Sequence, residues 1–133
     1  MAGRKLSAKA EEEVGFLENL LLQCDTLSRK TEEYAGMAKG GDSVLQAITR
    51  QLSNIRQNAM MKNLGPIADA AGMLGVAAMR GSQMQRTRVL REGIASFKLN
   101  IERVMKATIG ADARAREEDA KVMEARKAKG ETS

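Results

Sequence analysis

The sequence predicts an all-α fold, an antiparallel helical bundle of three to four helices followed by a charged tail. Of 133 residues one is proline and 2% are aromatic, while Ala, Leu, Glu, Lys, Arg, Gln and Met are abundant. Such side chains lose little rotamer freedom in a helix. Apolar residues recur at three- and four-residue steps, and no run alternates apolar and polar residues as a strand would. We expect one bundle domain over residues 1–110 and a tail over residues 111–133.

The first helix is expected over about residues 8–38. Ser7 is placed to cap it, and three glutamates, Glu11 to Glu13, follow where the helix dipole favours negative charge. One face carries a nearly continuous apolar stripe: Leu6, Ala10, Leu17, Leu20, Cys24, Leu27, Thr31, Tyr34 and Ala38. This helix would be about 46 Å long, against about 32 Å for the second. Part of it is therefore expected to lie uncovered.

The second helix is expected over residues 43–63. Ser43 and Gln46 have the spacing of a capping box, in which each side chain satisfies a backbone N–H of the other residue. Its apolar stripe consists of Leu45, Ile48, Leu52, Ile55 and Ala59. Pro66 ends this segment, because its ring disfavours helix at the preceding residue and suits the first position of the next helix.

Two further helices are expected over residues 66–80 and 83–109. Gly81 marks a break, and Ser82 with Gln85 repeats the capping-box spacing, although one continuous helix remains an alternative. The stripe of the last helix is Leu90, Ile94, Phe97, Ile101 and Val104, and Gly110 is expected to stop it. The remainder has only Val122 and Met123 as large apolar side chains. It is expected to be a frayed helix or disordered.

Residues 64–81, LGPIADAAGMLGVAAMRG, are unusually apolar and small. As a helix, Leu64 to Met79 reaches about 24 Å, too short for a hydrocarbon core of about 30 Å. Five large side chains, Ile67, Met73, Leu74, Val76 and Met79, would each forfeit roughly 1.5–3 kcal/mol in water. The stretch should therefore be covered, either as the packed centre of the bundle or as a docking face for a partner helix.

No catalytic, cofactor or metal site is predicted. The sequence has no histidine, which removes the commonest general base and metal ligand. The single cysteine, Cys24, lies on an apolar stripe and resembles a buried hydrophobe more than a nucleophile. An enzyme is not expected. One cysteine, no apolar signal region and no long apolar run lead us to expect a cytoplasmic protein without transmembrane insertion, and a secreted protein whose signal has been removed is the alternative.

Residues 80–110 carry seven basic and two acidic side chains, and this excess equals the net charge of the whole chain, +5. The candidate contacts for nucleic acid or another anion are Arg80, Arg86, Arg88, Arg91 and Lys98. Arg88, Arg91 and Lys98 share a face roughly opposite the apolar stripe. No aromatic side chain nearby could stack on a base, so nucleic-acid association is the alternative function, not the favoured one.

The favoured function is a non-catalytic protein–protein interaction or scaffolding module that associates with itself. Ala68 with Gly72 and Ala71 with Gly75 are four residues apart and make a face where another helix can approach closely. Met60 and Met61 are adjacent and cannot both lie on one buried stripe, so one of them is expected to contact another chain. The candidate interface consists of Met60, Met61, Ala68, Ala71, Gly72, Gly75 and Met79.

Overall fold

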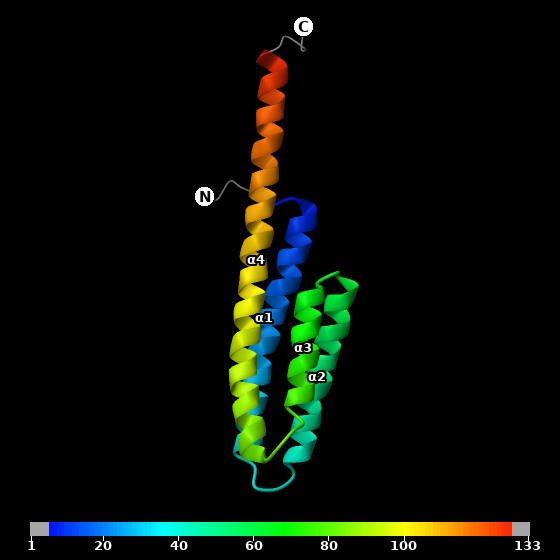
Figure 1. The fold of residues 1–133 in the computed structure, drawn as a ribbon, viewed down its shortest axis with the longest axis vertical. Coiled ribbons are helices and arrows are strands. Elements are labelled where there is room, and N and C mark those ends of the chain that lie inside the picture. Colours follow the sequence, from blue (N-terminus) through cyan, green and yellow to red (C-terminus); the bar gives the residue numbers. More distant parts are fainter. Residues whose placement is uncertain (1–5, 129–133) are drawn as a thin grey trace.

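The predicted fold class is confirmed. The computed structural model describes residues 6–128 and contains four helices: α1 (Ala8–Ala35), α2 (Gly41–Met61), α3 (Gly65–Ala77) and α4 (Gln83–Ala128). They run alternately down and up, so that each helix is antiparallel to the next (Figure 1). α1 packs chiefly against α4 and α2 chiefly against α3, with smaller contacts between α1 and α2 and between α3 and α4.

The core is aliphatic and extends along the bundle axis. The stripes predicted for the helices form most of it. Ala38 is the exception, because α1 ends at Ala35 and not at residue 38 as predicted, and Ala38 is exposed in the turn that follows. The largest fully buried side chains of the core are Phe97, Leu17, Leu20, Leu27, Ile48, Leu52, Ile55, Ile67, Leu90 and Ile101. Cys24 lies among them. Each helix therefore buries one stripe, while its other faces remain in contact with solvent.

Two of the predicted helix starts are confirmed by their hydrogen bonds. The Ser7 hydroxyl accepts from the Ala10 backbone N–H at 3.2 Å. The Gln85 side chain accepts from the Ser82 N–H at 2.8 Å, and the Ser82 hydroxyl accepts from the Gln85 N–H at 3.2 Å. This second pair is a capping box that starts α4. Together with Gly81, at φ 83°, it separates α3 from α4 and resolves the alternative of one continuous helix.

The capping box predicted at Ser43 is wrong. α2 begins two residues earlier, at Gly41, after Gly40 with a left-handed φ of 78°, and no side chain caps it. A Cβ on Gly41 would lie 3.2 Å from the Tyr34 ring. The tight turn against that ring fixes where α2 starts, and Ser43 therefore lies inside the helix.

The predicted end at Gly110 is also wrong, because α4 continues to Ala128. The residues after Gly110 are strong helix formers, and one glycine costs only about 1 kcal/mol relative to alanine. The 46 residues of α4 reach about 69 Å. The overhang that no other helix covers therefore belongs to α4, whereas the predicted lengths placed it on the first helix. The start of α1 does extend past the α2–α3 turn, and α4 lies beside it there (Figure 1).

The overhang begins near Asp112, whose carboxylate accepts from the Ser7 backbone N–H at 3.2 Å, beside the start of α1. We refer to residues 113–128 as the arm. Figure 1 shows the arm continuing past the start of α1 and past the α2–α3 turn. The charged tail predicted after residue 110 is thus helical through Ala128.

Candidate partner interface

α3 has one packed face and one open face. Ile67, Ala68, Ala71 and Leu74 are buried against the rest of the bundle. Met73, Val76 and Met79 are 73%, 59% and 49% exposed. The two roles weighed for this segment therefore fall on different sides of it: the chain itself covers Ile67 and Leu74 and leaves Met73, Val76 and Met79 open.

The open face of α3 borders a groove shared with α2. We define the α2–α3 groove by Ser53, Arg56, Gly72, Met73, Val76 and Met79, and its cavity volume is about 960 Å³. Gly72 and Gly75 form part of its lining. A Cβ on Gly75 would lie 3.9 Å from Leu52 Cβ, an ordinary contact distance. The groove thus has a low, side-chain-poor floor and methionines along its rim.

Two arginines flank this groove. A Cβ on Gly72 would lie 3.0 Å from Arg56 Cδ, so the Arg56 stem rests on the backbone of Gly72. Arg80 lies just beyond the end of α3, and both arginines line the cavity and are exposed. Within residues 6–128 neither forms a salt bridge. Asp69 also lines the cavity, so the groove has two arginines and one carboxylate, an excess of one positive charge.

The predicted interface residues fall into three groups. Ala68 and Ala71 are 2% and 0% exposed, because they pack inside the bundle, and they offer no surface to a partner. Gly72 and Gly75 are partly buried in the groove, and Met79 is on its rim. Met60 and Met61 are both exposed near the α2–α3 turn. Sequence reasoning missed Met73, Val76 and Arg56 as surface residues of this groove.

A second shallow groove lies between α1 and α4, with a volume of about 450 Å³. Leu99 and Ile109 line it, but Glu102, Arg103 and Lys106 lie among them. Its apolar surface is therefore interrupted by charge. The α2–α3 groove presents the more continuous apolar rim.

The predicted basic face is largely paired with acidic side chains. Arg91 donates from Nε and Nη2 to the two carboxylate oxygens of Glu32, at 2.8 and 2.6 Å. This hydrogen bonding lowers the pKa of Glu32 and raises that of Arg91. Lys98 lies 3.8 Å from Asp25 on α1. Arg91 and Lys98 therefore connect α4 to α1, and their charges are less available to a partner.

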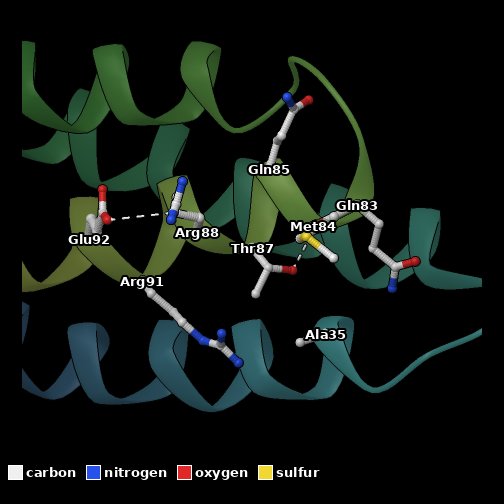
Figure 2. A pocket seen from close by; sticks show the side chains of 8 residues that line it. All are labelled: Ala35, Gln83, Met84, Gln85, Thr87, Arg88, Arg91 and Glu92. Carbon is white, nitrogen blue, oxygen red and sulfur yellow. Dashed lines mark hydrogen bonds and ion pairs between the residues drawn. The ribbon is translucent and has the colours of Figure 1, made fainter.

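Arg88 and Arg86 have different surroundings. Arg88 Nε is 4.0 Å from Glu92 on the same helix. Figure 2 shows this pair on the side of α4 away from Arg91, which reaches toward α1. The Arg86 guanidinium donates to the Met79 carbonyl at 3.0 Å and so ties the α3–α4 connection to α4. The five predicted cations are thus brought together along one segment, but they do not form one uniform patch.

The depression drawn in Figure 2 lies between the end of α1 and the start of α4 and has a volume of about 740 Å³. The Gln83 side chain donates to the backbone carbonyls of Tyr34 and Met37, at 2.8 and 2.7 Å. It therefore satisfies carbonyls at the end of α1. The charged residues lining the depression are paired as described above, and its polar groups serve the fold.

Cys24 is buried, and burial raises the pKa of its thiol to about 11. A thiol in this state is a poor nucleophile at neutral pH. Among residues 6–128, no group of three or more His, Cys, Asp or Glu side chains could hold a metal ion. None of the helices in that part of the chain is long and apolar enough to cross a membrane.

Comparisons with protein-family models, with curated proteins and with solved structures find no match to this chain. Among the surfaces of the chain itself, the α2–α3 groove has the most continuous apolar rim.

Proposed function

We propose that this protein is a non-catalytic interaction module that binds an amphipathic helix of a partner in the α2–α3 groove. The observation that carries the proposal is the exposure of Met73 and Val76 on one face of α3, and of Met79 in the turn that follows it, beside the groove shared with α2. The partner helix would place an apolar stripe in the groove and acidic residues next to Arg56 and Arg80.

The energetics favour a helical ligand. Covering a large apolar side chain is worth roughly 1.5–3 kcal/mol, so the three exposed side chains supply a substantial driving force. Methionine adapts its shape to different ligands, as in other helix-binding grooves. Gly72 and Gly75 face Arg56 and Leu52 of α2, so the ligand would contact the exposed side chains of the rim.

The charges favour an acidic ligand. Arg56 and Arg80 have no salt-bridge partner within residues 6–128. Carboxylates on a bound helix would pair with them and fix its position along the groove. The alternative expectation, nucleic-acid association through the basic helix, has less support, because Arg91 and Lys98 are already paired with Glu32 and Asp25.

A designed peptide tests the proposal. We expect a synthetic helix with a leucine stripe flanked by glutamates to shift the NMR signals of the Met73 and Met79 methyl groups. The methyl group of Met84, which is 82% exposed and lies outside the groove, serves as the internal control. A lysine-flanked version of the peptide should bind at least about tenfold more weakly, since it faces like charges.

The substitution Val76→Glu should abolish these shifts, while Met84→Glu should leave them unchanged. Both side chains are exposed, so neither change disturbs the core. Shifts of similar size for both peptides, or no shift at the two groove methionines, would overturn the proposal.

A further inference from the structure

We propose that the outward face of α4 pairs with the same face of α4 in a second copy of this chain, in an antiparallel and two-fold symmetric contact. The inference goes beyond the proposed function, because it concerns a different surface from the α2–α3 groove. Three observations carry it: the spacing of the residues on this face, the exposure of its apolar side chains, and an order of charges that complements itself when the helix is reversed.

α4 has a second stripe in addition to the one in the core. The buried stripe, from Leu90 to Ile101, repeats at steps of four and three residues, and a set of residues on the outward side follows the same steps. We define the outer stripe as Ala95, Leu99, Glu102, Lys106, Ile109 and Ala113. Because these steps keep side chains on one face of a helix, the outer stripe can contact a single partner helix along its length.

The centre of the outer stripe is open to a partner. Leu99 is 60% exposed and Ile109 is 41% exposed, although both line the shallow groove beside α1. Between them lie Glu102 and Lys106, which form no salt bridge within residues 6–128. A second helix laid along the stripe would therefore remove apolar surface from water and could pair with both charges.

The order of residue types along the outer stripe is small, large, acidic, basic, large, small. Reading the stripe backward exchanges the acidic and basic positions and leaves the others unchanged. An antiparallel second copy centred between Glu102 and Lys106 therefore places each Glu102 opposite Lys106 of the other copy. Leu99 then lies opposite Ile109, and the alanines at the two ends of the stripe lie opposite one another, where they let the helices approach closely. The two-fold axis repeats each contact, so both copies use the same surface.

The same register pairs one further charge on each side of the stripe. Glu92 and Arg116 continue its spacing and lie opposite one another across the two copies. Each also has a partner on its own helix: Arg88 Nε is 4.0 Å from Glu92, and Arg116 Nε is 3.4 Å from Asp112. Each end of the contact therefore carries a row of four charges of alternating sign, a network that is worth more than an isolated exposed pair.

Arg103 is the basic side chain that gains no partner across the axis. It flanks the outer stripe and approaches Arg103 of the other copy, but it is exposed, so solvent and salt screen the repulsion. Against this one like-charge contact the register provides two Glu102–Lys106 pairs and two Glu92–Arg116 pairs. The balance of charges at the contact is therefore attractive.

Other arrangements of the same face are less favourable. A parallel pair would place Glu102 opposite Glu102 and Lys106 opposite Lys106. An antiparallel pair displaced by one heptad would place Leu99 opposite Arg116, or Ala95 opposite Lys106. Each of these brings like charges together or sets an apolar side chain against a charge. The outer stripe thus favours one orientation and one register.

Sedimentation velocity of the full chain over a wide concentration range tests this inference. We expect a reversible monomer–dimer equilibrium. Leu99→Glu should weaken dimerisation at least about tenfold, because it places a carboxylate opposite Ile109 of the other copy. Val76→Glu is the matched control: Val76 is 59% exposed, almost as much as Leu99, but it lies in the α2–α3 groove, so the equilibrium should not change. Circular dichroism checks that both variants keep their helices.

Charge reversal at the two central positions gives the sharper test. E102K and K106E each place like charges at both symmetric contacts and should dimerise at least about tenfold more weakly than the wild type. The double variant with both changes restores opposite charges and should dimerise about as tightly as the wild type. An equimolar mixture of the two single variants should also regain dimerisation, as a heterodimer. Arg50→Glu, a reversal at an exposed position of α2, is the control and should change nothing.

The outcomes separate this inference from the proposed function. A monomer at every concentration, a dimer that resists Leu99→Glu, or one that Val76→Glu weakens as strongly overturns the α4 contact. Undiminished dimerisation of the single charge variants, or no recovery in the double variant and the mixture, overturns it as well. If the glutamate-flanked peptide still binds in these cases, the proposed function stands. If the peptide fails to bind while the dimer responds as expected, only the proposed function is wrong.

Discussion

The two helix pairs of the bundle close their seams by different means. Between α1 and α4, polar side chains pair across the edge: Arg91 with Glu32, Lys98 with Asp25 and Thr108 with Glu13. Between α2 and α3, within residues 6–128, no salt bridge or side-chain hydrogen bond crosses the seam, and its open edge is glycine and methionine.

This difference indicates where the molecule can gain stability from a partner. Arg91, Lys98 and Thr108 on the α1–α4 edge already have partners, so a ligand beside them would have to displace those contacts. The α2–α3 edge exposes apolar surface and unpaired arginines instead. Burial there removes apolar area from water at no cost in existing hydrogen bonds.

The largest expected difference in the free energy of unfolding is between a substitution in the core and one on the open α2–α3 edge. Phe97 is 2% exposed and Val76 is 59% exposed. Phe97→Ala should lower the free energy of unfolding by about 3–5 kcal/mol, because it leaves a cavity. Val76→Ala should change it by less than about 0.5 kcal/mol at low protein concentration. Denaturant unfolding measures both, and a large loss for Val76→Ala would mean that the chain itself covers this side chain.

Gly93 of α4 faces α3, and Gly75 of α3 faces α2, and the room beside them differs. A Cβ on Gly93 would collide with the Leu74 side chain of α3, whereas a Cβ on Gly75 has room beside Leu52. Gly93→Ala should therefore cost roughly 1–2 kcal/mol, since overpacking outweighs the gain in helix propensity. Gly75→Ala should stabilise the fold by up to about 1 kcal/mol. Thermal unfolding of the two variants should give shifts of opposite sign.

The sequence predicted the fold class well, because the stripes that form the core have regular helical spacing. It placed the end of the last helix wrongly at Gly110, since the fate of one glycine depends on whether its neighbours continue the helix. It also misplaced the start of α2, because Tyr34, a residue of the preceding helix, determines the turn at Gly41. The helix propensity of the neighbouring residues decided the first case, and a contact between elements decided the second.

The candidate interface was predicted in part. The spacing of small residues indicated that α3 would approach another helix closely. It could not show that this helix would be α2, or that only one face of α3 would be covered. A second pattern of spacing in the same segment would have indicated the open face. Met73, Val76 and Met79 follow one another at three-residue steps on the side away from Ile67, Ala71 and Leu74, which predicts two faces with different surroundings.

A smaller effect on stability is expected at the two predicted capping boxes, because the one at Ser82 forms and the one at Ser43 does not. Ser82→Ala removes a hydroxyl that accepts from the Gln85 N–H, and the loss should be about 1 kcal/mol. Ser43→Ala changes an exposed residue inside α2, where alanine has the higher helix propensity, and should be neutral or slightly stabilising. Equal losses for the two variants in denaturant unfolding would contradict the assigned start of α2.

The smallest effect concerns the paired α1–α4 edge and its dependence on pH. Hydrogen bonding from Arg91 lowers the pKa of Glu32 in the folded chain below the ordinary value of 4.5. A lowered carboxyl pKa contributes stability above the unfolded pKa, and this stability is lost as the pH falls through the folded pKa. Stability should therefore decline in acid below about pH 4.5, only slightly per pair because the pair is exposed.

Glu32→Gln tests this assignment against Glu33→Gln, a neighbouring exposed residue with no salt bridge within residues 6–128. Thermal unfolding from neutral to acidic pH should show that Glu32→Gln lowers stability at neutral pH and reduces the further loss in acid. Glu33→Gln should follow the wild type at both ends of the range. High salt should diminish the difference between the two variants, because it screens an exposed ion pair. Identical pH profiles at low salt would mean that the Arg91 contact adds nothing to the closure of the α1–α4 edge.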